Sequence, residues 1–137
     1  MSHFILILSL VFLISCSSPI PDKPLKGTYW RLIKLKGQDL QSFDHQPYVH
    51  LFFHINDTSV HGSNGCNTLQ AKYSQKNEAF SFRKIVFSNA SCEEGKEQSQ
   101  IFDRILKKTN RLLIRGDQLF LYNSDQKIAQ FEIKEDY

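Results

Sequence analysis

Short alternations of apolar and polar residues, separated by tight turns, run through most of the chain and restrict its fold to a small antiparallel sheet. Residues 28–36 alternate in this way, with Trp30 and Leu32 on one side and Arg31 on the other. A period of two is typical of a strand that buries one face. Further strands are expected at residues 48–55, 59–61, 71–74, 79–82, 85–87, 112–115, 119–122 and 128–133. Because short turns join consecutive strands, we expect an antiparallel meander.

One segment, at about residues 93–109, has the pattern of a helix. Its apolar residues recur at helical spacing: Ile101, Phe102, Ile105 and Leu106. Ser91 and Glu94 fit a capping box, and Gly95 favours a later start of the regular helix. The expected fold is therefore α+β: a mostly antiparallel β meander coiled into a partly open barrel, with one main α-helix packed against it.

The composition excludes several classes of protein. The chain has 137 residues, enough for one domain, and its 41% hydrophobic and 23% charged residues are an ordinary globular balance. The net charge is only +3, and the one basic cluster is Lys107, Lys108 and Arg111, so nothing points to nucleic-acid binding. No stretch reaches the roughly 20 apolar residues that a membrane-spanning helix needs. A multidomain enzyme, a polytopic membrane protein and a nucleic-acid binder are therefore excluded.

The N-terminus has the pattern of a bacterial lipoprotein signal. Residues 4–14 are apolar apart from one serine, which is the length of the hydrophobic region of a signal peptide. The boundary Leu13-Ile14-Ser15-Cys16 resembles a lipobox, which implies lipid attachment to Cys16 and removal of residues 1–15. The first three residues depart from the usual pattern, because they contain no Lys or Arg. The alternative is an uncleaved N-terminal anchor or a buried apolar segment.

Residues 16–24 are expected to be a flexible tether between the membrane and a domain at residues 25–137. Three of the four prolines lie in this segment, and it has neither a strand nor a helix pattern. Ser17, directly after the lipidated cysteine, resembles a sorting signal for the outer membrane. We therefore expect a lipid-anchored protein of the bacterial cell envelope, located at the outer membrane and facing the periplasm.

The three cysteines are consistent with this compartment. With Cys16 used for the lipid, Cys66 and Cys92 remain, and an oxidising compartment favours a disulfide between them. Such a bridge would stabilise the fold by about 3–4 kcal/mol on the chain-entropy model. The alternative is a pair of buried free thiols.

Four short motifs follow one another along the chain: residues 27–32 (GTYWRL), 60–67 (VHGSNGCN), 91–92 (SC) and 115–121 (RGDQLFL). This order resembles the META domain family, which includes HslJ-like, heat-shock-inducible bacterial lipoproteins. The resemblance covers about residues 25–133. One departure is Ala90, which stands where the family often has Met. The resemblance implies an envelope protein, linked to stress, drug tolerance or motility in some members, and it carries over no enzymatic activity.

The spacing of the reactive residues predicts no catalytic, cofactor or metal site. His50 and His54 share one face of a strand but lie ~13 Å apart along it, which is too far for both to bind one metal ion. His45 and His61 could approach each other, but no ligand spacing surrounds them. Cys66 and His61 could form a nucleophile and its base, but the second available cysteine favours the disulfide. We therefore expect that the protein is not an enzyme.

The aromatic content of 12% leaves two interpretations of His50, Phe52 and His54. They line a groove or the barrel interior, or they belong to the packed core, which is the favoured interpretation. The expected function is a non-catalytic binding or assembly module, anchored to the membrane through Cys16 and in contact with an envelope protein. The first alternative is a carrier or sensor that holds a small apolar ligand inside the barrel, and a hydrolase is a more remote one.

Overall fold

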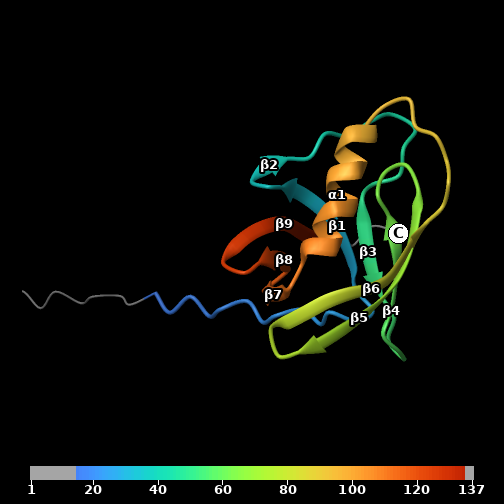
Figure 1. The fold of residues 1–137 in the computed structure, drawn as a ribbon. Helices are drawn as coiled ribbons and strands as arrows, with labels where there is room; N and C mark the ends of the chain where they lie inside the picture. Colours follow the sequence, from blue (N-terminus) through green and yellow to red (C-terminus); the bar gives the residue numbers. More distant parts are fainter. Residues whose placement is uncertain (1–14, 135–137) are drawn as a thin grey trace, which may run out of the picture.

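The computed structural model describes residues 15–134, so most of the predicted signal peptide lies outside the described residues. Nine strands and one helix form in this part of the chain (Figure 1). In chain order they are β1 (Tyr29–Leu35), β2 (Gln38–Asp39), β3 (His50–Phe53), β4 (Ser59–Ser63), β5 (Thr68–Lys76), β6 (Ala79–Phe87), α1 (Lys96–Lys108), β7 (Arg111–Arg115), β8 (Gln118–Asn123) and β9 (Gln126–Ile133). Within these residues no helix is long and apolar enough to cross a membrane.

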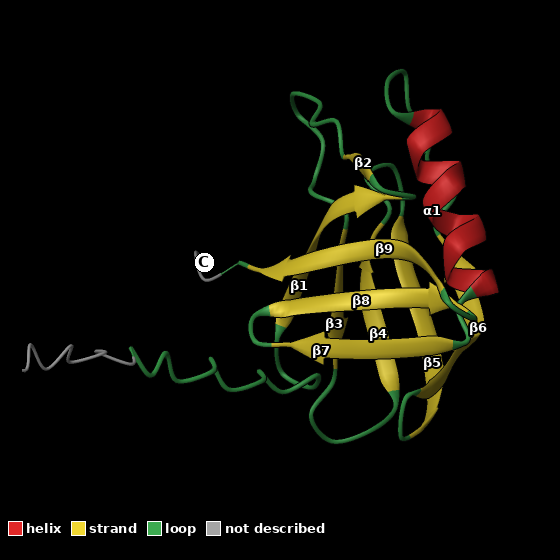
Figure 2. Cartoon of the chain, turned by 90° about the vertical axis from the view of Figure 1, so that its left-hand side faces the viewer, coloured by secondary structure: helices red, strands yellow, loops and turns green. Residues whose placement is uncertain are grey.

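The strands form one antiparallel sheet that closes into a ring. Their order is β2-β1-β3-β4-β5-β6-β7-β8-β9, and β1 also pairs with β9. The link between β6 and β7 is the weakest, because it consists of the single pair Ala79 and Arg111. In Figure 2, β7, β8 and β9 cross in front of β3, β4 and β5, and α1 stands at one side. The predicted α+β class, the mostly antiparallel sheet and the single helix are confirmed.

The alternation along the strands produces the core, because alternate side chains point into the ring. Phe53 lies within an aromatic cluster and meets Tyr73 edge to face, with 5.3 Å between ring centroids. From the helix, Phe102 meets Phe131 of β9 at 6.3 Å. The largest fully buried side chains are Trp30, Phe53, Phe102, Phe131, Leu51, Leu69, Ile105, Leu106, Leu119, Leu121, Val60 and Asn64. Packed side chains therefore fill the centre of the ring.

Helix α1 begins later than the pattern of a capping box predicts. Gly95, with φ of 70°, occupies the N-cap position, and no side chain caps the helix. The predicted capping box of Ser91 and Glu94 is therefore wrong. The physical reason is that the left-handed turn at Gly95 separates Ser91 from the first helical turn. The expected apolar stripe is confirmed for Phe102, Ile105 and Leu106, which are buried, and Ile101 is half-buried.

The strand predicted at residues 48–55 ends earlier than expected. Ile55 was expected to share the buried face of its strand, but it is 68% exposed. Strand β3 ends at Phe53, and the His54 amide donates to the carbonyl of Ser59, which closes the turn before Ile55 can reach the core. Gln38 and Asp39 add a short strand, β2, which pairs with the end of β1.

The segments expected at residues 71–74, 79–82 and 85–87 belong to one long hairpin, β5–β6. The sequence pattern does not show that these segments are continuous, because a bulge interrupts the alternation. The register shifts between Gln70 and Lys72, and Lys84 on the opposite strand has φ of 51°. Such an extra residue interrupts the alternation of two and makes one strand look like two.

The end of the predicted tether contacts the folded domain. The backbone amide of Lys23 donates to the carbonyl of Gly116 at 2.8 Å. In return, the Gly116 amide donates to a carboxylate oxygen of Asp22 at 2.7 Å. Asp22 and Lys23 therefore lie against the turn between β7 and β8, on the side of the ring opposite α1 in Figure 2.

Candidate functional site

The most distinctive motif of the sequence, residues 60–67, spans the end of β4 and the loop between β4 and β5. The first glycine of this motif, Gly62, cannot be replaced without a backbone clash. A Cβ atom on Gly62 would lie 2.0 Å from the carbonyl oxygen of His50 on the neighbouring strand. Because β3 and β4 are paired at this point, neither backbone can move away freely. The glycine therefore allows the close approach that begins the loop.

Asn64 organises the loop and joins it to the helix. Its side-chain oxygen accepts hydrogen bonds from the amides of Cys66, at 2.9 Å, and Asn67, at 2.6 Å. Its side-chain nitrogen donates to Asp103 of α1 at 2.9 Å. The Asn64 backbone carbonyl accepts from the hydroxyl of Ser99 at 2.7 Å. Since Asn64 is 2% exposed, these bonds replace the water that burial removes.

A disulfide joins the same loop to the segment before α1. Cys66 and Cys92 are bonded, with 5.6 Å between their Cα atoms. Beside them, the side-chain oxygen of Asn67 accepts from the amide of Ala90 at 2.6 Å. Because Cys66 is part of the disulfide, it offers no thiolate, and the nucleophile considered with His61 is not present in this structure.

Asp103 has a perturbed ionisation at this junction. Burial is the main cause, and it raises the pKa of the Asp103 carboxyl above its usual range. The hydrogen bond from Asn64 and the charges of Lys107 and Arg104 act in the opposite direction. The half-buried carboxylate thus serves as an acceptor for Asn64 at some electrostatic cost.

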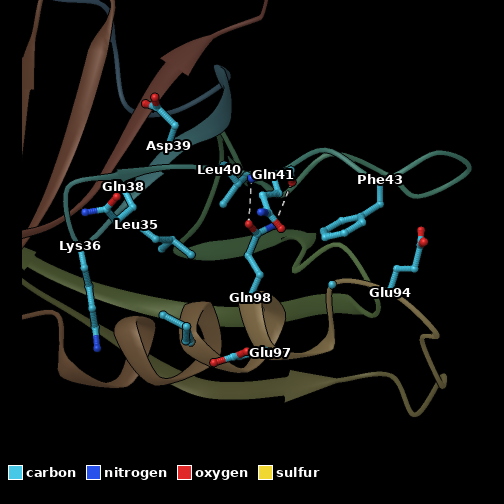
Figure 3. A pocket seen from close by; sticks show the side chains of 12 residues that line it. Leu35, Lys36, Gln38, Asp39, Leu40, Gln41, Phe43, Glu94, Glu97 and Gln98 are labelled. Carbon is cyan, nitrogen blue, oxygen red and sulfur yellow. Dashed lines mark hydrogen bonds between the residues drawn. The ribbon is translucent and has the colours of Figure 1, made fainter.

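Helix α1 forms one wall of a groove of about 540 Å³ (Figure 3). It lies between the segment after β1 and the first turns of α1. The apolar lining residues are Leu35, Leu40, Phe43 and Ile101. The charged lining residues are Lys36, Asp39, Glu94 and Glu97. We call this feature the helix groove.

Hydrogen bonds hold the two walls of the helix groove in place. The side-chain amide of Gln98 accepts from the backbone amide of Gln41 at 2.9 Å and donates to its carbonyl at 3.0 Å, as the dashed lines in Figure 3 show. The Gln46 side chain donates to the carbonyl of Glu94 at 2.9 Å. A Cβ atom on Gly95 would lie 2.7 Å from the ring of Phe43, so the glycine lets this ring reach the groove.

The chemistry of the helix groove suits binding. Asp39 is paired with Lys34 at 3.3 Å, whereas Glu94 and Glu97 have no ion pair within residues 15–134. Three carboxylates against the single ammonium group of Lys36 leave an excess of negative charge in the lining, so the groove combines apolar side chains with net negative charge. Among the same residues, no group of three or more His, Cys, Asp or Glu side chains could hold a metal ion.

The histidines lie on the outer face of the sheet. The Nε2 atom of His54 and the Nδ1 atom of His61 are 2.6 Å apart, so the partner of His61 is His54 and not His45. Phe52 pairs with His61 across β3 and β4, and its ring lies 5.1 Å from the His61 ring. His50 stacks on Tyr29 at 4.2 Å. None of His50, Phe52 and His54 therefore lies in the interior or in the buried core, and the favoured core interpretation is wrong. The groove interpretation holds for His54 alone, which lines a hollow on this outer face.

The environment of two histidines lowers their pKa values. Burial is the main cause for His50, and burial followed by the nearby His54 is the cause for His61. Sequence reasoning missed the pair of His54 and His61. The short connection between β3 and β4 was the signal that could have indicated it, because such a turn brings residues seven apart to neighbouring positions.

The predicted lipidation site, Cys16, lies outside this region. Cys16 is exposed and forms no disulfide within the described residues, so it is sterically available for modification. The residues of the helix groove were not singled out as a site. Leu40 and Phe43, isolated apolar residues within an otherwise polar connection, were the available signal.

Comparisons with known proteins support the fold. One protein solved by NMR is 15% identical to the chain, with a TM-score of 0.64, and the match covers 80% of this chain and 91% of that protein. Another NMR structure, of a protein from Burkholderia xenovorans, is 19% identical to the chain, with a TM-score of 0.68. This match covers 89% of this chain and 95% of that protein. At these identities the likeness shows the fold alone. No protein with a curated description matches the chain. The model of the META domain family matches residues 23–136, and the chain therefore belongs to the META domain family.

Proposed function

We propose that this protein is a lipid-anchored component of the bacterial cell envelope whose META domain binds a partner protein without catalysing a reaction. The helix groove is the proposed binding site, and a basic, partly apolar segment of an envelope protein is the proposed occupant. The carrying observation is the combination of an apolar lining with the unpaired carboxylates of Glu94 and Glu97. Complementary charge favours a basic partner, and the apolar residues offer area to bury.

The structural roles of the residues in the motif at 60–67 support a binding function. Gly62, Asn64 and Cys66 are the most distinctive residues of the chain, and each is engaged in backbone packing, hydrogen bonds or the disulfide. A catalytic group needs a reactive atom that is free to meet a substrate. These residues instead position the start of α1, which is one wall of the helix groove.

The N-terminus supports the proposed location. Leu13-Ile14-Ser15-Cys16 fits lipid attachment at Cys16, and Ser17 favours the outer membrane. The acyl chains of a lipoprotein anchor strongly, since each buried methylene contributes about 0.8 kcal/mol. The resemblance to HslJ-like lipoproteins favours a role during stress. Because the tether docks on the side opposite α1 in Figure 2, the helix groove would face away from the membrane.

A carrier or sensor of a small apolar ligand is the second candidate. The volume of the helix groove, about 540 Å³, lies within the range of small-molecule sites. Side chains such as Trp30 and Phe131 fill the ring, so a ligand would sit in the helix groove and not in the interior.

Site-specific photo-crosslinking in living bacteria tests the proposal. A photoreactive amino acid replaces Gln38, an exposed residue of the helix groove, in the full-length protein. The same amino acid at exposed Gln75, outside the groove, is the control. We expect one envelope protein to crosslink from position 38 only, through a segment that mass spectrometry identifies as basic and apolar.

Charge reversal then tests whether the groove itself is recognised. Glu94→Lys with Glu97→Lys should abolish the crosslink, because it turns the attraction into repulsion. Glu93→Lys with Asp125→Lys makes the same charge change on exposed residues outside the groove and should preserve the crosslink. Equal crosslinking from positions 38 and 75, or an unchanged crosslink after reversal at Glu94 and Glu97, would refute the proposal. An adduct with a small apolar molecule alone would favour the carrier.

A further inference from the structure

A second hollow lies on the outer surface of β4, β5 and β6 and shares no residue with the helix groove. Its volume is about 420 Å³. The lining residues are His54, Ser59, Val60, His61, Gln70, Ala71, Lys72, Lys84 and Val86. We call this feature the strand hollow. It contains two lysines and two histidines but no acidic residue, so every ionisable side chain in its lining is basic.

The two lysines of the strand hollow are not neutralised by ion pairs. Neither Lys72 nor Lys84 forms one among residues 15–134. The ammonium group of Lys72 donates to the hydroxyl of Ser59 at 2.5 Å, which holds it beside the hollow. Asp57, in the preceding turn, lies outside the lining of the hollow; its carboxylate accepts a hydrogen bond from the Ser59 amide at 2.7 Å and interacts electrostatically with Lys72 and His54.

The bulge in β6 places Lys84 in the strand hollow. Phe80 and Phe82 point into the core, so strict alternation would turn residue 84 inward as well. The residue takes a left-handed backbone conformation instead, with φ of 51°, and both Arg83 and Lys84 are exposed. A non-glycine residue in this conformation is uncommon, and bulges often re-aim a side chain next to a functional site.

The histidine pair adds further hydrogen-bonding capacity. His54 and His61 contact each other at 2.6 Å, and both line the hollow. In a neutral pair one ring donates to the other, and the remaining ring N–H is available for an acceptor.

We propose that the strand hollow binds the phosphate group of a small soluble phosphorylated molecule such as a sugar phosphate. A phosphate monoester carries a charge of about −1.5 to −2 and three strong acceptor oxygens, which matches two ammonium groups and an imidazole N–H. A carboxylate has one charge and two oxygens and would leave one lysine without a partner. Val86, 63% exposed, and the side chain of Gln70 offer apolar and polar contacts to the rest of such a molecule.

Calorimetric titration of the full-length protein in detergent with glucose 6-phosphate tests this proposal. We expect saturable binding at one site, with glucose and acetate at the same ionic strength showing none. Lys72→Gln with Lys84→Gln should weaken the affinity at least tenfold, because both charged contacts are lost. The control Lys108→Gln with Lys127→Gln removes the same charge from exposed positions outside the hollow and should leave the affinity within twofold.

Three results would overturn the proposal. The first is the absence of saturable binding of glucose 6-phosphate. The second is an equal loss in the two double-lysine variants, which would mean that the interaction is unspecific attraction. The third is binding to phosphatidylglycerol vesicles without binding to glucose 6-phosphate, which would assign the lysines to the membrane surface. The Glu94→Lys and Glu97→Lys changes should leave phosphate binding intact, so this test is independent of the helix groove.

Discussion

At the scale of single residues, the loop between β4 and β5 shows how one buried polar side chain can organise a fold. Asn64 satisfies two amides of its own loop and reaches Asp103 on the helix, so one side chain fixes both the loop and its distance from α1. Buried polar groups of this kind stabilise the native state only while every partner is present. Just before this loop, in β4, lies Gly62, where the available space is smaller than a methyl group.

Replacing Gly62 with alanine should destabilise the domain by about 3 kcal/mol or more, because the new Cβ would overlap the His50 carbonyl oxygen. Gly37→Ala is a suitable control. Nothing lies within 4 Å of its new Cβ, and only its φ of 78° carries a cost, of about 1 kcal/mol. Urea unfolding monitored by the single tryptophan compares the two. Equal losses in both variants would show that the contact with His50 is not the cause.

Asp103→Asn should stabilise the domain at neutral pH. Burial raises the pKa of Asp103 in the folded state, so the folded state binds its proton more tightly than the unfolded state does. This contribution is fully present below the unfolded pKa and is lost as the pH rises through the folded pKa. The asparagine removes the half-buried charge and keeps an acceptor for Asn64. Unfolding measured across the acid range should show the difference between variant and wild type shrinking as the pH falls, and a difference that grows would contradict the assignment.

At the scale of elements, the helix depends on its packing. An isolated helix of 13 residues is marginal in water, and α1 has no side-chain cap. Its stability comes from a stripe of buried side chains, of which Phe102 is the largest. The disulfide fixes the segment that leads into it.

Phe102→Ala should cost about 3–5 kcal/mol, because it opens a cavity between α1 and β9. Lys108→Ala, on the exposed side of the same helix, should change the stability by less than about 0.5 kcal/mol. Chemical denaturation of both variants is the measurement. A nearly neutral Phe102→Ala would mean that the helix is not held by this contact.

Removal of the disulfide with Cys66→Ala and Cys92→Ala should destabilise the domain by about 3–4 kcal/mol, since the bridge closes a loop with a sequence separation of 26. Cys16→Ala is the matched control and should leave the stability of the domain unchanged, because Cys16 is exposed and outside the sheet. Thermal unfolding under non-reducing conditions distinguishes them. Two alkylatable thiols in the freshly purified native protein, in addition to any at Cys16, would contradict the bridge.

At the scale of the whole molecule, the ring has two distinct sides. The tether reaches it at the turn between β7 and β8, and α1, which forms one wall of the helix groove, lies on the other side (Figure 2). Such an arrangement would present the groove to the periplasm if the chain is anchored through Cys16.

Lipid attachment is therefore the prediction at this scale. Labelling with a fatty-acid analogue should mark the wild-type protein in bacterial cells, and Cys16→Ala should abolish the label and leave an unprocessed precursor. Cys92→Ala, which preserves the N-terminal motif, should retain the label. Equal labelling of wild type and Cys16→Ala would end the lipoprotein assignment.

Local patterns determined much of this structure before any tertiary contact was known. The alternation around Trp30 and Leu32, the tight turn at Gly116 and the apolar stripe of α1 are properties of a few neighbouring residues, and they determine the strands, a hairpin and the helix face. The order of the short motifs was enough to indicate the META domain family.

Only the tertiary structure decided the features that depend on residues distant in sequence. The pairing of β1 with β9 closes the ring, and no local pattern encodes a contact between the two ends of the domain. The bulge at Lys84, the contact of His54 with His61 and the helix groove each depend on register and on packing between elements. Periodicity and turn chemistry act over a few residues, whereas a binding surface is assembled by strands and loops that the sheet brings together.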